Sequence, residues 1–70
     1  MMPLSMARAG EEASVKKISG REETRRFLEK LGFVPGARVS VVTENNGNMI
    51  VSVKESRVAV SREMALKIII

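Results

Sequence analysis

Residues 27–42 read FLEKLGFVPGARVSVV and contain the end of a helix, a tight turn and the start of a strand. Gly32 can take the left-handed conformation that ends a helix in a Schellman motif, which brings Phe33 back against Leu28. Pro35 and Gly36 suit the central positions of a type II turn, because proline presets φ and glycine accepts the positive φ. The stretch therefore predicts a helix joined at a fixed angle to a β-strand. The residues expected to have architectural roles are Leu28, Gly32, Phe33, Pro35 and Gly36.

The helix on the N-terminal side of this stretch is predicted to run from about residue 21 to residue 31. Ser19 and Glu22 have the spacing of a capping box, in which each side chain satisfies a free backbone amide at the helix start. One face of the helix is expected to pack on the core. The side chains on that face are Thr24, Phe27, Leu28 and Leu31.

Strand patterns account for most of the remaining chain. Residues 13–18 predict a first strand, and Leu4 and Met6 in the leading segment are available to fill the core. After Gly36 the patterns predict strands over 37–43, 49–53, 57–60 and 66–70, a hairpin loop at 45–48, a reversal at 54–56 and a helical turn over 61–65 capped by Ser61. About five short strands with one helix after the first favour a small antiparallel barrel, since closure buries both the inner face and the strand edges.

The composition limits the chemistry that the chain can perform. Seventy residues, 1–70, are expected to form one domain in which nearly every large apolar side chain is needed for packing. The chain has no Cys, His or Asp, and its eight acidic residues are all Glu. Thiolate catalysis, histidine bases and most transition-metal ligands are therefore excluded. We expect a protein that is not an enzyme and has no cofactor.

The net charge of +4 raises the alternative of a small basic nucleic-acid-binding barrel. The charge is spread evenly along the chain, however, and the two phenylalanines both have packing roles in the predicted helix and turn. Barrels that bind single strands use exposed aromatic side chains to stack bases, so nucleic acid is the less favoured partner. The longest apolar run, residues 68–70, is too short to span a bilayer, and we expect a cytoplasmic protein without direct membrane insertion.

The order of these elements resembles the FeoA family, the small partners of the FeoB ferrous iron transporter. The segments that carry the resemblance are residues 4–10, 18–20, 31–39 and 58–65, together with the basic helix and the apolar C-terminal strand. The resemblance extends over essentially the whole chain. One departure is the hairpin loop at residues 44–48, which reads ENNGN where relatives often have a Pro-Leu-Gly-Asp-Pro-like stretch.

The resemblance implies an SH3-like barrel that supports ferrous iron uptake by binding or modulating the cytoplasmic part of the FeoB-type transporter. It thus implies a non-enzymatic accessory protein of iron homeostasis, held at the inner face of the membrane through its partner. The same core also occurs as the C-terminal domain of iron- and manganese-dependent repressors, which carry a DNA-binding domain ahead of it.

Two groups of side chains are candidates for contact with such a partner. They are Arg25 and Arg26 on the helix, and Asn45, Asn46 and Asn48 in the hairpin loop. An ordinary solvated helix face is the favoured explanation of the arginines, because Glu22 precedes Arg26 by four residues and Glu29 follows Arg25 by four.

Two further features concern metals and self-association. The adjacent carboxylates at 11–12 and 22–23 do not converge on one point, so they predict no metal site. The sequence does not decide whether a weak homo-oligomer forms through the edge of residues 67–70.

Overall fold

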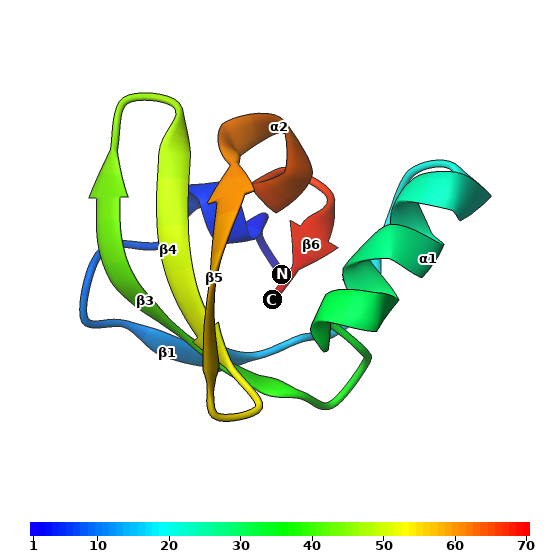
Figure 1. Ribbon diagram of the computed structural model, residues 1–70, viewed down its shortest axis with the longest axis horizontal. Coiled ribbons are helices and arrows are strands. Elements are labelled where there is room, and N and C mark those ends of the chain that lie inside the picture. The colour runs from blue at the N-terminus through cyan, green and yellow to red at the C-terminus, as the bar shows by residue number, and fades with distance from the viewer.

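The computed structural model describes residues 1–70 and contains two sheets and two α-helices. In chain order the elements are η1 (Leu4–Met6), β1 (Glu12–Ser14), β2 (Lys17–Ile18), α1 (Glu22–Leu31), β3 (Arg38–Asn45), β4 (Asn48–Val53), β5 (Ser56–Ser61), α2 (Arg62–Ala65) and β6 (Ile68–Ile69). One sheet has the order β1-β3-β4-β5 (Figure 1). The other sheet pairs β2 with β6. The expected mainly β architecture is confirmed, but with six strands, and with α1 after the second strand.

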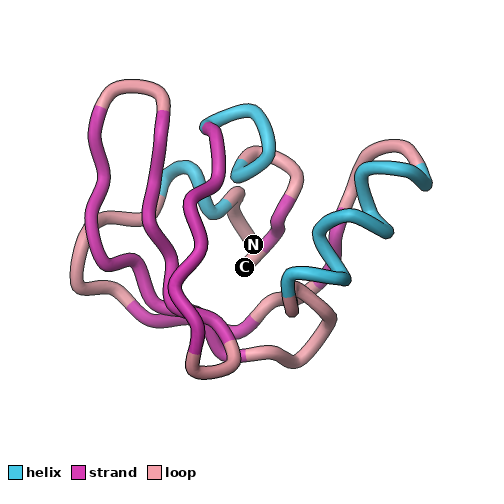
Figure 2. The backbone as a smooth tube through the Cα atoms, in the orientation of Figure 1, coloured by secondary structure: helices cyan, strands magenta, loops and turns pink.

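The four-stranded sheet curves around the chain ends (Figure 2), and thirteen buried apolar residues form one core cluster. The strands are antiparallel, and alternate residues such as Val39, Val51 and Val53 point inward and are almost fully buried. A register shift between Val41 and Thr43 marks a bulge in β3, a device that increases local twist. The other buried apolar residues are Leu4, Ala7, Val15, Leu28, Phe33, Val41, Met49, Val60, Ala65 and Ile68.

The single first strand expected over residues 13–18 is wrong, because the chain changes sheets within it. The amide of Val15 donates to the Ala37 carbonyl, next to β3, at 2.8 Å. The amide of the following residue, Lys16, donates to Ile69 in β6 at 2.7 Å. Two successive residues are thus bonded to different sheets, and a pattern of side-chain hydrophobicity does not record which backbone each amide meets.

The predicted capping box at the start of α1 is also wrong. The N-cap residue is Arg21, which makes no side-chain capping bond. Ser19 instead pairs with the C-terminal segment: its amide donates to the Lys67 carbonyl at 2.8 Å and its hydroxyl to the same oxygen at 3.3 Å. Ser19 therefore extends the β2–β6 pairing and does not cap α1.

The packing face of α1 is narrower than expected. Leu28 is fully buried and Thr24 and Leu31 are half-buried, but the side chain of Phe27 is 50 % exposed. The helix extends away from the sheets (Figure 1), so only its C-terminal half contributes to the core. The expectation that Phe27 packs on the core is therefore wrong.

The end of α1 has the two hydrogen bonds of a Schellman motif. Gly32 has φ 110°, its amide donates to the Glu29 carbonyl at 2.9 Å, and the Phe33 amide donates to Leu28 at 3.0 Å. The turn that follows closes with a 2.9 Å bond from the Ala37 amide to the Val34 carbonyl, and Gly36 at its third position has φ 90°. The helix thus enters β3 through two successive glycine-dependent reversals.

The two chain ends lie together and close the second sheet. Met2 and Ile70 exchange two backbone hydrogen bonds, of 2.9 and 2.8 Å, and β6 pairs with β2 on its other side. Both sides of the C-terminal segment thus have backbone partners, so residues 67–70 offer no free strand edge for pairing with a second copy. Of the leading apolar residues, Leu4 is buried, but Met6 is 65 % exposed because the η1 turn directs it outward, against expectation.

Candidate partner-binding surface

The β3–β4 hairpin tip carries three of the residues predicted to contact a partner. Asn45 pairs with Asn48 at the end of the ladder, and Asn46 and Gly47 form the two-residue loop. Gly47 has φ 96° and supplies the positive φ that this tight loop needs. All three asparagine side chains are exposed.

These asparagines border a polar pocket of about 270 Å³ between the hairpin and α2. The remaining lining residues are Ser5, Glu44, Met49 and Arg62. The position of α2 against the tip is set by two bonds: the Arg62 amide donates to the Gly47 carbonyl at 3.0 Å, and the Met64 amide to the Ser61 hydroxyl at 3.2 Å. The predicted N-cap role of Ser61 is confirmed.

The pocket offers hydrogen-bond donors and acceptors with one charge of each sign. Side-chain amides both donate and accept, Glu44 accepts and the Arg62 guanidinium donates. Such a surface suits a polar segment of another molecule. The sequence did not indicate Ser5 or Arg62, because they reach the pocket from η1 and α2 and not from the hairpin. The one available signal was the position of Arg62 directly after the helix cap.

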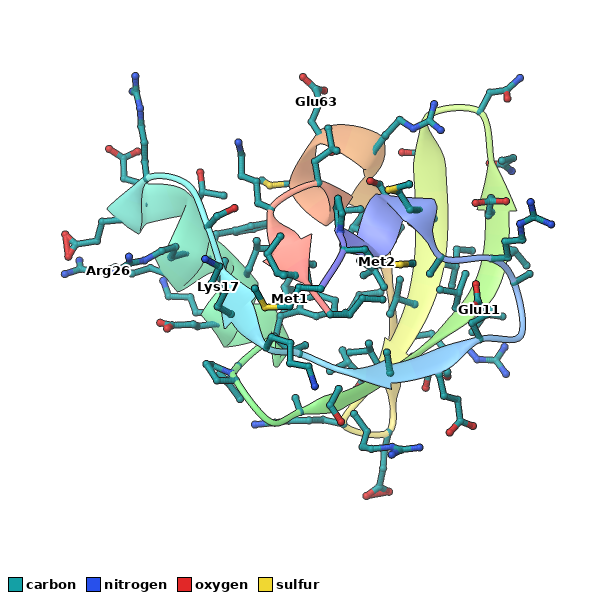
Figure 3. All side chains as sticks on the ribbon, turned by 180° about the vertical axis from the view of Figure 1, so that it is seen from behind. Met1, Met2, Glu11, Lys17, Arg26 and Glu63 are labelled. Atoms are coloured by element: carbon teal, nitrogen blue, oxygen red, sulfur yellow. The ribbon has the colours of Figure 1, made fainter.

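The basic residues of α1 lie on a separate surface from the hairpin tip. Arg26 forms an exposed ion pair with Glu22 at 3.3 Å, as in an ordinary solvated helix, whereas Arg25 has no ion pair. Seen from behind, Arg26 is at one side of the molecule and Glu11 at the other (Figure 3). The β3–β4 hairpin and α1 lie on opposite sides of the molecule (Figure 1), so the structure does not bring Arg25 and Arg26 together with the asparagines.

An apolar groove of about 280 Å³ lies near the two chain ends. Met1, Met2 and Ile70 line its outer part, and Val39 and Val41 of the core line its inner part. Figure 3 shows Met1 and Met2 beside the ends of the chain. Of the groove residues, only Ile70 belongs to a segment considered from the sequence as a contact surface, the 67–70 edge.

The carboxylates nearest this groove have protein partners. Glu11 accepts a 2.6 Å bond from the Arg8 amide, and Glu12 a 2.8 Å bond from the Arg38 guanidinium. No group of three or more His, Cys, Asp or Glu side chains could hold a metal ion. No helix has the length and apolar character required to cross a bilayer.

The architecture defines a small SH3-like domain. It is similar to the Stenotrophomonas maltophilia FeoA, described as a prokaryotic SH3 domain protein and crystallised with zinc, at 25 % identity over 99 % of this chain and 88 % of that one, with a TM-score of 0.86. A manganese-dependent transcriptional repressor shares the fold at 21 % identity and a TM-score of 0.90, with 96 % of this chain aligned to 38 % of the repressor.

The family follows from the sequence. The family model of the FeoA domain matches residues 2–70. A Methanocaldococcus jannaschii protein whose name assigns it to Fe(2+) transport as protein A is 37 % identical over 70 residues, covering 100 % of this chain and 85 % of that protein. An iron uptake regulatory protein (FeoA) of known crystal structure is 29 % identical, with a TM-score of 0.91 over 96 % of this chain and 91 % of that one. The chain belongs to the FeoA family, non-catalytic accessory proteins of ferrous iron transport.

Proposed function

We propose that this chain acts in ferrous iron uptake by protein–protein contact with the cytoplasmic part of a FeoB-type transporter. In this proposal residues 1–70 work as one domain in the cytoplasm, reaching the inner face of the membrane through the partner. The full-length family match supports the iron transport role. The observation that carries the contact is the polar pocket at the hairpin tip, where Asn45, Asn46 and Asn48 meet Arg62.

Titration calorimetry against the transporter's isolated cytosolic domain tests the contact, with each nucleotide state measured separately. The double variant Asn46→Ala/Arg62→Ala removes pocket side chains without touching the β3–β4 ladder. We expect it to weaken binding at least about tenfold, since losing hydrogen bonds to a charged group costs about 1.5–3 kcal/mol. Absence of binding by the unaltered chain in every nucleotide state would refute the proposal.

A second double variant separates the two candidate surfaces. Arg25→Ala/Arg26→Ala changes the far side of the molecule and leaves the pocket intact, so it serves as the matched control. If it weakens binding more than the hairpin variant does, α1 is the contact surface and the pocket is not. Thermal melting of both variants shows that the fold is retained.

One observation bears on the alternative of a nucleic-acid-binding barrel. Phe27 is half exposed on the helix that also carries Arg25 and Arg26. It gives one aromatic ring for base stacking, whereas barrels that bind single strands stack successive bases on several. Nucleic-acid binding predicts an affinity that falls steeply with salt. An oligonucleotide titration at low salt therefore decides between nucleic-acid binding and contact with the transporter.

A further inference from the structure

The outer edge of β5 has no hydrogen-bonding partner. β5 is the last strand of its sheet and pairs only with β4. Val53 and Ser56 close the two-residue hairpin between β4 and β5, and such a closing pair is hydrogen-bonded. Along an antiparallel ladder, hydrogen-bonded pairs alternate with pairs whose N–H and C=O groups point away from each other. Arg57 and Ala59 therefore direct their N–H and C=O groups away from β4, and neither residue takes part in any other backbone hydrogen bond.

Of the features that usually prevent strand addition, this edge has only a charged side chain, that of Arg57. β5 is six residues long, contains no proline and has no bulge in its register with β4. At the opposite edge of the sheet, β1 is only three residues long. The long helix α1 does not cover the edge, because it stands apart from β5 (Figure 1). Arg57 and Ala59 are both exposed.

The charge of the edge indicates what kind of strand it accepts. Arg57 is the only charged side chain of β5, and it belongs to neither of the two ion pairs of the structure. The whole chain carries +4, so pairing with a second copy would bring together two positive surfaces. Pairing of two six-residue strands is also a small contact for a stable dimer, which usually buries at least about 1,200 Å².

We infer that the outer edge of β5 binds an extended acidic segment of another protein, which adds to the sheet as a further antiparallel or parallel strand. The backbone groups of Arg57 and Ala59 supply the hydrogen bonds, and the Arg57 guanidinium pairs with a carboxylate of the added strand. This surface shares no residue with the hairpin pocket, so it does not depend on the contact proposed there.

The test uses a short synthetic peptide in which valine alternates with glutamate, and a matched peptide with lysine in place of glutamate. Amide hydrogen exchange of the full chain is followed by NMR. With the glutamate peptide the amides of Arg57 and Ala59, unprotected in the free protein, are expected to exchange at least about tenfold more slowly. The lysine peptide is expected to give weaker protection.

Variants identify the groups responsible. Ala59→Pro removes the outward N–H and should abolish protection at Arg57, whereas Ala59→Thr keeps the N–H and a good strand former and should preserve it. Arg57→Glu should reverse the preference so that the lysine peptide binds better. If Ala59→Pro does not fold, Ala59→Thr and Arg57→Glu still test whether the peptide binds at this edge.

Three results would overturn the inference. One is unchanged exchange at Arg57 and Ala59 with the glutamate peptide at millimolar concentration. Another is equal or better protection by the lysine peptide on the unaltered chain. The third is protection that rises with protein concentration in the absence of peptide, which would assign the edge to a second copy of the chain.

Discussion

The backbone amide of Phe33 donates a 3.0 Å hydrogen bond to the carbonyl of Leu28, and both side chains are completely buried. The residues are five apart, so the left-handed step at Gly32 between them folds the chain back on the last turn of α1. One local motif therefore ends the helix, delivers an aromatic ring to the core and sets the direction in which the chain enters β3.

Neighbouring helix residues should respond very differently to truncation. Leu28→Ala leaves a cavity in the core and is expected to lower the free energy of unfolding by about 2–5 kcal/mol. Phe27→Ala removes a half-exposed ring and should cost clearly less. Urea unfolding followed by circular dichroism measures both. Equal losses would mean that Phe27 packs on the core after all.

The left-handed stop can be tested at Gly32. Gly32→Val places a β-branched residue at φ 110° and is expected to destabilise the fold by at least about 1 kcal/mol. The added Cβ would also lie 3.4 Å from side-chain atoms of Val53 and Lys54. Gly32→Asn is the matched variant, because Asn tolerates positive φ better, and it should lose less stability. An unchanged melting temperature for the valine variant would contradict this account.

The sequence predicted best those parts of the fold that are decided by short-range geometry. The helix end at Gly32, the turn at Pro35 and Gly36 and the cap at Ser61 each depend on bonds between residues a few positions apart. The predictions that failed for the first strand and for the start of α1 involve partners far along the chain. Ser19 bonds to a carbonyl 48 residues away, which the local capping pattern could not reveal.

The candidate surface likewise combines residues that short-range patterns predicted with residues that only the fold brings together. The hairpin loop at Asn45–Asn48 was evident from its turn residues, but the pocket beside it also needs Ser5 and Arg62 from distant parts of the chain. The unpaired edge of β5 is a property of sheet order, which the strand pattern alone does not contain. Resemblance to a family supplied the fold name and the partner class, and no periodicity in the chain could have done so.

The cap of α2 should contribute measurably to stability. The Ser61 hydroxyl accepts a 3.2 Å bond from the Met64 amide, so Ser61→Ala is expected to cost about 0.5–2 kcal/mol. Ser56→Ala is the matched control, because Ser56 is exposed in the same strand and its side chain makes no hydrogen bond. Thermal unfolding of the two variants is compared. A loss at Ser56 as large as that at Ser61 would show that capping is not the cause.

The β4–β5 turn holds two residues in an unfavourable conformation. Lys54 and Glu55 have φ 48° and 64° and form the two-residue loop of a type I′ turn, where Asn-Gly is strongly preferred. Replacing the pair, Lys54→Asn with Glu55→Gly, relieves the strain and leaves the net charge at +4, because one charge of each sign is removed. We expect stabilisation of about 1 kcal/mol, a rise of roughly 4–8 °C in Tm for a domain of this size. Gly47→Ala in the other hairpin, at φ 96°, should act in the opposite direction, and a Tm that falls in the double variant would contradict the assignment of strain to this turn.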